Sequence, residues 1–459
     1  MLSSPIALRN RVRHLPIVRK IEGLNLTGKV FLVGGALREL ALTHLPNDYD
    51  FAMEASSDLR ALEKVFGARA FLLGKRPAQT HRIVSGEITL DITLLQGSID
   101  NDLLRRDFTI NAMAYDVKGE SILDPLQGWN DLSEGVIRYP RKESLEEDPL
   151  RMVKAIRHLS TMKGFSLASE VASAICANKT SIHRTAAERI KYELDLILIA
   201  KHVQKGIEAL RQTGLLFEIF PELRRLLELD MEKTLEPQAL GHTLGAYQYM
   251  GRVRRFHPLT DREARQVAYA LLFHDLGKAR TFSYDEEKEQ VHFLYHERAS
   301  CEIASAIMAR LRFGASEARA VLNLIENHMR LFLISNSNAT EKATRRLVYK
   351  MEELTPSLVW LTLLDLYGSS RGRENASSRG VRKKCREVLA ADVERLKAPL
   401  PRIVNGHDLM ALGFAEGPDL GRTLQEIREK QIAGEMNDRE EALEYARQAM
   451  GRRGEAVPA

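Results

Sequence analysis

The pattern of apolar and polar positions changes about a third of the way along this chain of 459 residues. In the first third, short apolar or β-branched runs that suit strands alternate with stretches of helical periodicity. Such runs occupy residues 71–73, 83–84 and 87–94. From about residue 146 the strand-like runs stop, and periodic apolar faces typical of helices occupy residues 190–199, 264–272 and 354–364. The pattern predicts an α+β protein with a small α/β head and a long all-α body.

Breaks in this pattern divide the chain into segments, in keeping with a prior of roughly 100 to 200 residues per domain. We expect a helical leader (1–28), a head (29–145), a helical neck (146–238), a second helical domain (239–372) and a charged helical tail (373–459). RNA binding is the role predicted for the tail, and its last residues, 451–459, are expected to be frayed.

Composition places the chain among ordinary globular proteins, with 44% hydrophobic and 28% charged residues. Three scattered cysteines exclude a disulfide framework and fit a reducing compartment. No apolar stretch approaches the ~20 residues that a membrane span requires. We therefore expect a cytoplasmic protein without a membrane partner.

The formal net charge of +5 is modest, but its distribution is informative. Arginines recur in short groups along the whole length, at positions 105–106, 224–225, 252–255, 345–346 and 452–453. This spread favours a long surface that follows a folded RNA backbone. The alternative for any one group is an ordinary solvated helix face.

The first stretch with chemical content runs from residue 29 to 51, KVFLVGGALRELALTHLPNDYDF. It predicts a strand, a tight turn at Gly34-Gly35, a short helix over residues 36–43, and a second strand that carries Asp48 and Asp50. Alternation along a strand places these two carboxylates side by side, where a hard cation such as magnesium would offset their repulsion. The glycines allow backbone amides to approach a phosphate, and Arg38 adds charge. An ordinary turn and an exposed strand end are the alternative.

The second stretch, residues 103–113, reads LLRRDFTINAM. Here paired arginines next to an aspartate can place one guanidinium group on a triphosphate while the acid orients it. Together, Gly-Gly-x-x-Arg, Asp-x-Asp and Arg-Arg-Asp-Phe-Thr-Ile-Asn-Ala-Met resemble the class II tRNA nucleotidyltransferase and bacterial poly(A) polymerase family. Glu39 follows Arg38 where that family usually has aspartate, so the acidic group is kept.

This resemblance implies a head similar to the catalytic domain of DNA polymerase β and template-independent nucleotidyl transfer to an RNA 3′ end. It implies tRNA as partner, CTP and possibly ATP as substrates, and two magnesium ions at Asp48 and Asp50. Asp91, in a strand pattern, is a candidate third carboxylate. The nucleotide-binding residues that it implies in the head are Gly34, Gly35, Arg38, Arg106, Asp107 and Asn111.

The third stretch is residues 147–157, EDPLRMVKAIR. Pro149 suits the first helical position and would make Asp148 only an N-cap. Helical spacing nevertheless places Asp148, Arg151, Lys154 and Arg157 on one face. In the family this motif selects the base. A carboxylate that accepts from the amino group and a guanidinium that donates to the ring nitrogen would admit CTP and ATP. Lys154 departs from the family's usual arginine.

Two further stretches resemble supporting motifs of the family. Residues 123–138 resemble its hinge between head and neck, and residues 187–194 resemble its last neck motif, which we interpret as helix packing.

A separate group of metal-binding residue types lies in residues 239–372. His242, the adjacent pair His274-Asp275, and Asp365 occur in the ligand order of the HD phosphohydrolase domain, with His296 and His328 at the positions of additional histidines in two-metal variants. Imidazole and carboxylate ligands suit manganese, nickel, iron or zinc. The alternative is a folded but catalytically idle HD module.

The identity of the added nucleotide is predicted from the stretch between the first two motifs. Family members that build the whole CCA end carry a flexible charged loop there, whereas this chain has no lysine or arginine between Glu87 and Leu104. We expect addition of C and CC, with full CCA addition, A addition and poly(A) synthesis as alternatives. Alternatives of other classes are an HD phosphohydrolase with an RNA-recognising head and a non-catalytic RNA-binding protein.

Overall fold

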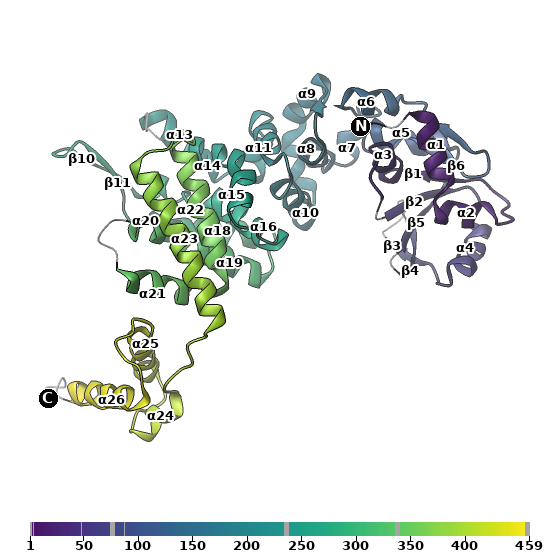
Figure 1. Cartoon of the computed structure of the whole chain (residues 1–459). Helices are drawn as coiled ribbons and strands as arrows, with labels where there is room; N and C mark the ends of the chain where they lie inside the picture. Colours follow the sequence, from purple (N-terminus) through teal and green to yellow (C-terminus); the bar gives the residue numbers. More distant parts are fainter. Residues whose placement is uncertain are drawn as a thin grey trace. The chain divides into compact units, whose positions relative to one another are not determined.

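The computed structural model describes residues 2, 4–46, 48–73, 79–86, 88–233, 238–335 and 340–454 (Figure 1). The chain divides into two compact units, Met1–Ile219 and Phe220–Ala459. Each unit has its own core, and we describe them separately. No helix of the described residues is both long and apolar enough to cross a membrane.

The first unit is built on a seven-stranded sheet with the order β3-β4-β5-β2-β1-β6-β7. Strand β2 pairs antiparallel with β1 and parallel with β5. The strands are β1 (Val30–Val33), β2 (Asp48–Met53), β3 (Phe71–Leu73), β4 (Thr80–Ser85), β5 (Ile88–Leu94), β6 (Ala114–Asp116) and β7 (Ser121–Leu123). The predicted strands are therefore present, and the mixed α+β head is confirmed.

Short helices precede and connect these strands before the neck begins. They are α1 (Pro5–Arg13), α2 (Pro16–Glu22), α3 (Gly35–Ala41), α4 (Leu59–Phe66), α5 (Ile99–Leu104), α6 (Gly128–Glu134) and α7 (Ser144–Glu147), with 3₁₀ turns at Ser56–Asp58 and Thr109–Asn111. Helix α1 begins with Ser4 as N-cap and Pro5 at its first turn. Because Leu8, Val12 and Ile21 are buried, the leader belongs to the core of the head.

The neck completes the first unit. It contains α8 (Arg151–Thr161), α9 (Ser169–Asn178), a 3₁₀ helix (Lys179–Arg184), α10 (Ala187–Leu198), α11 (Val203–Gln212) and α12 (Leu215–Ile219). Their apolar faces pack together, and helix α8 lies against α10 and α11.

The prediction that strands stop after residue 146 is wrong in two places. Strand β9 (Ser166–Leu167) pairs parallel with β8 (Val136–Ile137), and β10 (Phe282–Asp285) pairs antiparallel with β11 (Gln290–Phe293). Two-residue strands carry too little alternation to be recognised from sequence. The hairpin has a charged turn between two four-residue strands that mix apolar and polar residues, so no strand pattern distinguishes it among the helices.

The second unit is helical and is organised around α22 (Thr355–Ser369), which is buried along almost its whole length. The other helices of its body are α13 (Leu223–Lys233), α14 (Ala239–Ala246), a 3₁₀ turn (Tyr247–Tyr249), α15 (Met250–Phe256), α16 (Asp261–Phe273), α17 (Lys278–Thr281), α18 (His296–Arg310), α19 (Ala315–Asn327), α20 (Arg330–Leu333), α21 (Glu341–Met351) and a 3₁₀ turn (Glu352–Leu354). Helices α14, α16 and α23 pack against α22.

The tail consists of α23 (Ala376–Lys397), α24 (Gly406–Ala411), α25 (Pro418–Ile432) and α26 (Arg439–Gly454). The last three helices form a small core of their own around Leu409, Ile427 and Ala442. The predicted charged helical tail is present. Of the segment expected to be frayed, residues 451–454 belong to α26, and 455–459 lie outside the described residues.

Candidate nucleotidyl-transfer site and metal centre

The two carboxylates predicted to act together both lie on β2. Asp48 is exposed and Asp50 half-buried, and Asp50 is the register partner of Val33 on β1 and of Asp91 on β5. Burial raises the pKa of Asp50, and the neighbouring charges of Asp91, Asp48 and Asp107 raise it further, while Arg106 opposes them. The ionised carboxylate of Asp50 therefore has too little positive charge around it. The carboxylate oxygens of Asp48 and Asp50 are ligands that fit a hard cation.

Asp91 is the neighbour of Asp50 but already has a partner. Its two oxygens accept hydrogen bonds of 2.7 and 2.6 Å from Nε and Nη2 of Arg82 on β4. The structure thus places the candidate third carboxylate beside the pair, with its charge neutralised from the adjacent strand.

Gly34 joins β1 to α3 directly against this cluster. Its φ is +78°, in the region that glycine adopts without strain. A Cβ atom here would lie 2.8 Å from Oδ2 of Asp50 and 2.9 Å from Nη1 of Arg106. The backbone therefore approaches both an acid and a cation of the site more closely than any other residue type would allow.

Arg38 and the second motif form one connected network. Nη1 of Arg38 donates to Oδ1 of Asn111, whose amide donates to Oδ1 of Asp107 at 2.9 Å. Gly35 lies beside the same guanidinium group: a Cβ atom added to Gly35 would lie 3.5 Å from Nη2 of Arg38. Oδ2 of Asp107 lies 3.9 Å from Nζ of Lys154. The structure therefore brings head motifs and the neck helix α8 together.

The acid that orients Arg106 differs from the prediction. Arg106 donates to Oδ2 of Asp102, one helical turn earlier, at 2.9 and 3.1 Å. Asp107 instead accepts from the backbone amide of Phe108 and from Asn111. Asp102 lies in the last turn of α5 and Arg106 lies just beyond the end of that helix, so Asp102 rather than the adjacent Asp107 holds the guanidinium group.

The hinge motif (residues 123–138) packs against the second motif (residues 103–113). The hydroxyl of Thr109 donates to Oδ2 of Asp131 at 2.6 Å, and Arg138 contacts the other oxygen of Asp131 at 3.2 Å. A Cβ atom on Gly128 would lie 2.1 Å from the carbonyl oxygen of Thr109. This packing fixes the 3₁₀ turn that carries Asn111.

The base-selecting motif begins differently from the prediction. Helix α8 starts at Arg151, so Asp148 is not its N-cap and lies ahead of the helix. Oδ1 of Asp148 accepts from the amide of Leu150 at 3.3 Å, and Oδ2 accepts from Nη2 of Arg189 at 2.9 Å. The side chain closes a local turn, which competes with capping.

Arg151 is held separately, since it donates to the carbonyl oxygens of Arg105 at 2.6 Å and Ser144 at 3.2 Å. Farther along α8, Nε of Arg157 lies 2.7 Å from Oε2 of buried Glu193 on α10. Sequence reasoning missed Arg189 as a partner of Asp148. The residues are 41 positions apart, and only the packing of α10 brings them together.

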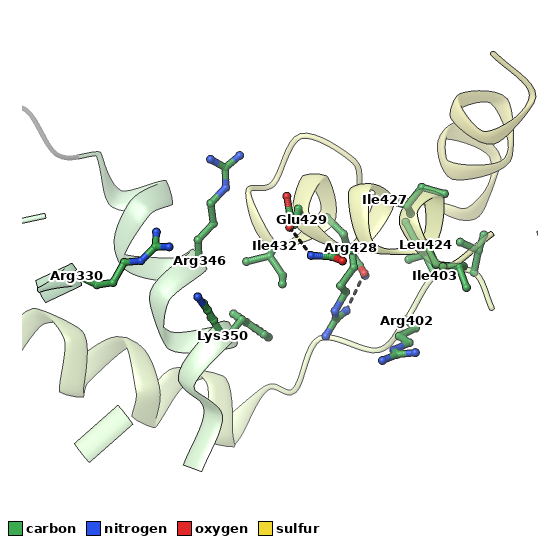
Figure 2. A pocket seen from close by; sticks show the side chains of 15 residues that line it. Arg330, Arg346, Lys350, Arg402, Ile403, Leu424, Ile427, Arg428, Glu429 and Ile432 are labelled. Atoms are coloured by element: carbon green, nitrogen blue, oxygen red, sulfur yellow. Dashed lines mark hydrogen bonds between the residues drawn. The ribbon is translucent and has the colours of Figure 1, made fainter. Parts of the chain in front are cut away.

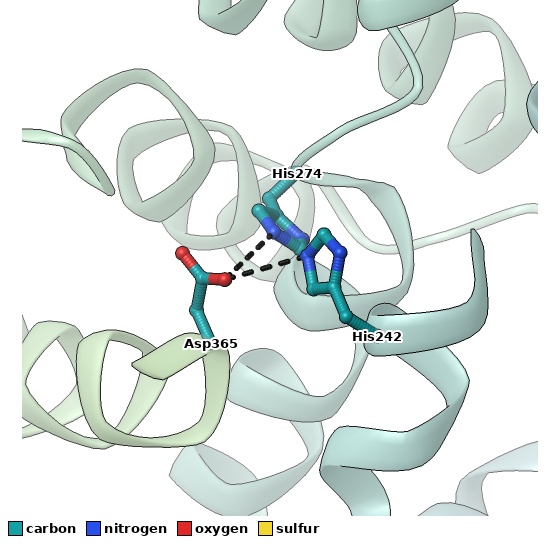
Figure 3. Close-up of side chains that lie close together, drawn as sticks. All are labelled: His242, His274 and Asp365. Atoms are coloured by element: carbon teal, nitrogen blue, oxygen red, sulfur yellow. Dashed lines mark ion pairs between the residues drawn. The ribbon is translucent and has the colours of Figure 1, made fainter. Parts of the chain in front are cut away.

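The second group of candidate ligands is a buried cluster in the second unit. It comprises His242, His274 and Asp365 on one side and Asp275, His296 and His328 on the other, with the ligand atoms of each trio within 4.8 Å of one another. Figure 3 shows both histidines of the first trio turned toward Asp365. The two oxygens of Asp275 join the trios, since Oδ2 lies 3.1 Å from Nε2 of His242 and Oδ1 lies 3.5 Å from Nε2 of His296.

The ring orientation of the four histidines is set by the backbone. In each ring Nδ1 lies within hydrogen-bond distance of a carbonyl oxygen, of Gln238 (3.0 Å), Leu271 (2.7 Å), Phe293 (2.9 Å) and Ile325 (2.7 Å) in chain order. An Nδ1 that donates leaves the lone pair of Nε2 directed into the cluster. Nε2 of His242 and of His274 is buried and makes no hydrogen bond with the described residues.

Charge in the cluster also favours a cation. The Nε2 atoms of His296 and His328 lie 3.1 Å apart, so two lone pairs face each other unless a proton or metal lies between them. Burial, with the neighbouring charge of His274, lowers the pKa of His328 to about 4. Burial also lowers the pKa of His242, but Asp275 and Asp365 outweigh it and raise that pKa to about 10. The six residues fit one or two metal ions.

Comparisons with known proteins match segments of both units. Residues 78–138 match the poly(A) polymerase head domain, 164–227 match the probable RNA and SrmB-binding site of polymerase A, and 239–368 match the HD domain. A CC-adding tRNA nucleotidyltransferase from Thermus thermophilus is 33% identical over 424 residues, which cover 90% of this chain and 92% of the relative. The chain belongs to the tRNA nucleotidyltransferase family.

Other members of the tRNA nucleotidyltransferase family are similar along comparable lengths. An A-adding tRNA nucleotidyltransferase from Deinococcus radiodurans is 29% identical over 90% of this chain and 94% of its own length. The Thermotoga maritima CCA-adding enzyme complexed with tRNA shares the fold, with a TM-score of 0.61 and 20% identity over 98% of this chain and 99% of the other. A CCA-adding enzyme in complex with CTP has a TM-score of 0.64 at 19% identity, over 98% of this chain and 99% of that one. The family and fold predicted from the sequence are confirmed.

Proposed function

We propose that this tRNA nucleotidyltransferase adds cytidine residues to the 3′ end of tRNA and stops after CC. The observation that carries this proposal is the connector between β5 and α5, which spans only residues 95–98. Its first amide, on Leu95, donates to the carbonyl of Met53 at 2.8 Å, and its last residue, Ser98, caps α5. Leu95 and Ile99 pack on the core of the head. Such a connector is anchored at both ends.

A short anchored connector favours one base geometry. Switching from cytosine to adenine requires both more room and a shifted hydrogen-bonding edge, and this connector has neither the length nor the charged side chains to act as a lever. The CC-adding relative supports this proposal, whereas the A-adding relative keeps A addition as the alternative. Full CCA addition is a further alternative, and nothing specific favours poly(A) synthesis.

The reaction is a nucleotidyl transfer, in which one phosphorus–oxygen bond forms and another breaks. The 3′-hydroxyl oxygen of tRNA bonds to the α-phosphorus of CTP, the bond from that phosphorus to the bridging β-phosphate oxygen breaks, and pyrophosphate leaves. The hydroxyl proton passes to solvent. We assign Arg106 and Arg38 to the triphosphate, Gly34 and Gly35 to close backbone approach, and Asp148 with Arg151 to the cytosine edge.

We infer that Asp48 and Asp50 hold magnesium, because their oxygens are hard ligands and Asp50 lacks positive charge. Bound magnesium would supply acidity to the attacking hydroxyl group and neutralise charge on the phosphates. We propose Asp91 as the third carboxylate of this site, held in place by its ion pair with Arg82.

Product sequencing tests the proposal. A tRNA that ends at its discriminator base is incubated with the protein, magnesium, CTP and ATP, and its 3′ ends are sequenced. Ends that stop at CC support CC addition. Efficient addition of the final A at physiological ATP would contradict the connector argument, and absence of any CMP or AMP incorporation would contradict the transferase.

We also propose a metal-dependent phosphohydrolase activity for the second unit. The facing Nε2 lone pairs of His296 and His328, joined to the other trio through Asp275, favour this over an idle module. Manganese, nickel, iron or zinc suits the ligands. Elemental analysis and phosphate-ester hydrolysis of 2′,3′-cyclic nucleotides test it. A His274→Ala/Asp275→Ala variant should lose both metal and hydrolysis, and metal-loaded wild type without hydrolysis would indicate the idle module.

A further inference from the structure

Helix α14 brings a single ligand, His242, to the metal cluster, and its first turn lacks a cap from its own residues. The helix spans only Ala239–Ala246. Gln238, the residue at its N-cap position, makes no capping hydrogen bond with its side chain. An isolated helix of this length is marginal in water, and its first backbone amides need partners from elsewhere. The position of His242 therefore depends on what holds the start of α14.

The partner of those amides is Asp230, which lies on the preceding helix, α13. Its side chain is buried, and only 4% of the residue is exposed. Oδ1 accepts from the amide of Ala239 at 2.7 Å, and Oδ2 accepts from the amides of Leu240 and Gly241 at 2.9 and 3.4 Å. One carboxylate thus satisfies three consecutive amides, and its negative charge is favourable at the positive end of the helix dipole. Asp230 therefore caps a helix to which it does not belong.

The capped turn is joined to the ligand through one carbonyl group. The carbonyl oxygen of Gln238 accepts from the backbone amide of His242 at 2.9 Å, and Nδ1 of the same histidine lies 3.0 Å from it. The backbone and the ring of His242 are thus tied to one atom, directly before the three amides that Asp230 holds. Nε2 of the ring then lies 3.1 Å from an oxygen of Asp275 and 3.4 Å from an oxygen of Asp365. A displacement of the turn would move the ring as well.

Helix α14 is also held by close packing against α22. A Cβ atom on Gly368 of α22 would lie 2.6 Å from the carbonyl oxygen of His242 and 2.9 Å from Cβ of Ala246. The same helix carries Asp365, so this close approach keeps two ligand-bearing helices together. Contacts from outside α14 therefore hold it at two places, Gly368 from its middle onward and Asp230 at its start.

The helices that bring other ligands to the cluster are longer. Helix α16, with His274 at its C-cap, has 13 residues and a capping box of its own. Helices α18 and α22, which carry His296 and Asp365, have 15 residues each, whereas α14 has eight. Of these ligands, His242 is therefore the one most sensitive to the loss of a single contact from outside its own helix.

We propose that Asp230 is a positioning residue of the metal centre, which holds the start of α14 and thereby aims Nε2 of His242 at the bound metal ion. The proposal deepens the proposed function of the second unit, because it rests on metal binding by the histidine cluster. Asp230 belongs to neither ligand trio. It acts through the amides of residues 239–241 and the carbonyl group of Gln238.

Titration of the metal-free full chain with Mn²⁺ tests this role, with the free ion measured by electron paramagnetic resonance. Binding outside the cluster is measured in the His274→Ala/Asp275→Ala variant and subtracted. For Asp230→Asn we expect the affinity of the cluster for Mn²⁺ to fall by about 10- to 100-fold, because one of the two accepting oxygens becomes an amino group that cannot accept from a backbone amide. Asp230→Glu, which keeps both oxygens and the charge, should restore most of the affinity.

The matched control is Arg428→Gln, in the same unit. Arg428 of α25, shown in Figure 2, also holds another segment through its backbone, because it donates to the carbonyl oxygens of Leu400 and Pro401 at 2.9 and 3.4 Å. That segment carries none of the six candidate ligands, so the affinity for Mn²⁺ should equal that of the wild type. Circular dichroism shows whether each variant is folded without metal. For a variant that is not, the rise of its melting temperature with Mn²⁺ concentration gives the affinity instead.

The outcomes separate the positioning role from the proposed hydrolase. Wild-type affinity for Mn²⁺ in Asp230→Asn, or equal weakening in Arg428→Gln, would overturn the positioning role alone. The expected loss of affinity in Asp230→Asn, in a protein whose wild type hydrolyses no 2′,3′-cyclic nucleotide, would support the positioning role and contradict the hydrolase. A wild type that binds no more Mn²⁺ than the His274→Ala/Asp275→Ala variant would contradict both.

Discussion

The carboxylate of Asp50 is surrounded by more acidic than basic side chains. Asp48, Asp91 and Asp107 all raise its pKa, and Arg106 is the cation that lowers it. Arg106 is held by Asp102 and Arg82 is held by Asp91, so neither of these arginines can pair fully with Asp50. The site is thus arranged to gain a cation and a triphosphate, and small displacements here should affect catalysis more than stability.

Gly34→Ala tests this arrangement. The added Cβ atom would overlap Oδ2 of Asp50 and Nη1 of Arg106, and we expect CMP transfer to fall by about 100-fold, the size of effect that a shift of ~1 Å produces in an active site. Affinity for tRNA should stay within a few fold. Gly67→Ala is the matched control, because Gly67 also has positive φ (+65°) but open space around it. Equal loss of transfer in both variants would assign the effect to backbone strain.

Asp148 depends on a residue from another helix. Its Oδ2 accepts from Arg189, and without that bond the carboxylate could rotate away from the cytosine amino group. For Arg189→Ala we expect misincorporation of UMP to rise by about tenfold relative to CMP, with Arg189→Lys restoring part of the selectivity. Competition assays with paired nucleotides measure this ratio. Arg184→Ala, which removes only a bond to the carbonyl of Glu146, should not change it; if it does, Arg189 merely stabilises the fold.

At the scale of elements, the sequence predicted the head strands and the long helices because their periodicity extends over many residues. It did not reveal the Asp102–Arg106 pair, because Arg106 lies beyond the end of α5 and the pair depends on how the chain leaves that helix. The Arg82–Asp91 pair requires the register of β4 on β5, and the Asp148–Arg189 pair requires the packing of α10 beside α8. The late start of α8 depends on the local turn at Asp148, which competes with capping.

Helix α8 also carries a buried titratable group. His158 stacks edge-on against Phe108 at 5.2 Å between ring centroids. Burial holds its pKa well below the usual value, and the charges of Arg38, Arg157 and Lys154 lower it further. This group is neutral in the folded state, whereas the unfolded chain takes up a proton near pH 6.5. Its contribution to stability is therefore present above pH 6.5 and is lost as the pH falls below it.

Denaturant unfolding at several pH values tests this prediction with a His158→Gln variant. Between pH 6.5 and 5 the free energy of unfolding of the wild type should fall more steeply, by up to ~1.4 kcal/mol per pH unit, than that of the variant. Parallel curves for the two proteins would mean that His158 binds a proton equally in both states.

On the scale of the whole molecule, each compact unit holds a different set of ligands. The residues assigned to CTP and magnesium lie in Met1–Ile219, and the histidine cluster lies in Phe220–Ala459. A ligand that binds only the folded state of one unit stabilises that unit, by ~2.7 kcal/mol at a concentration of 100 Kd. The two sites should therefore respond to different additions.

The two tryptophans make this separable, because Trp129 lies in α6 of the first unit and buried Trp360 in α22 of the second. In a Trp129→Phe variant, fluorescence reports the second unit. The melting temperature of the second unit should fall when a chelator removes metal, and it should not change when CTP and magnesium are added. In Trp360→Phe, which keeps an aromatic ring in the core, the responses should be reversed. Adding His274→Ala/Asp275→Ala should abolish the chelator effect in the first of these variants. A fall in melting temperature with chelator that survives the His274→Ala/Asp275→Ala change would mean that the stabilising metal is bound elsewhere. An equal fall at both tryptophans would mean that the two units unfold as one, because a metal in the histidine cluster should stabilise the second unit alone.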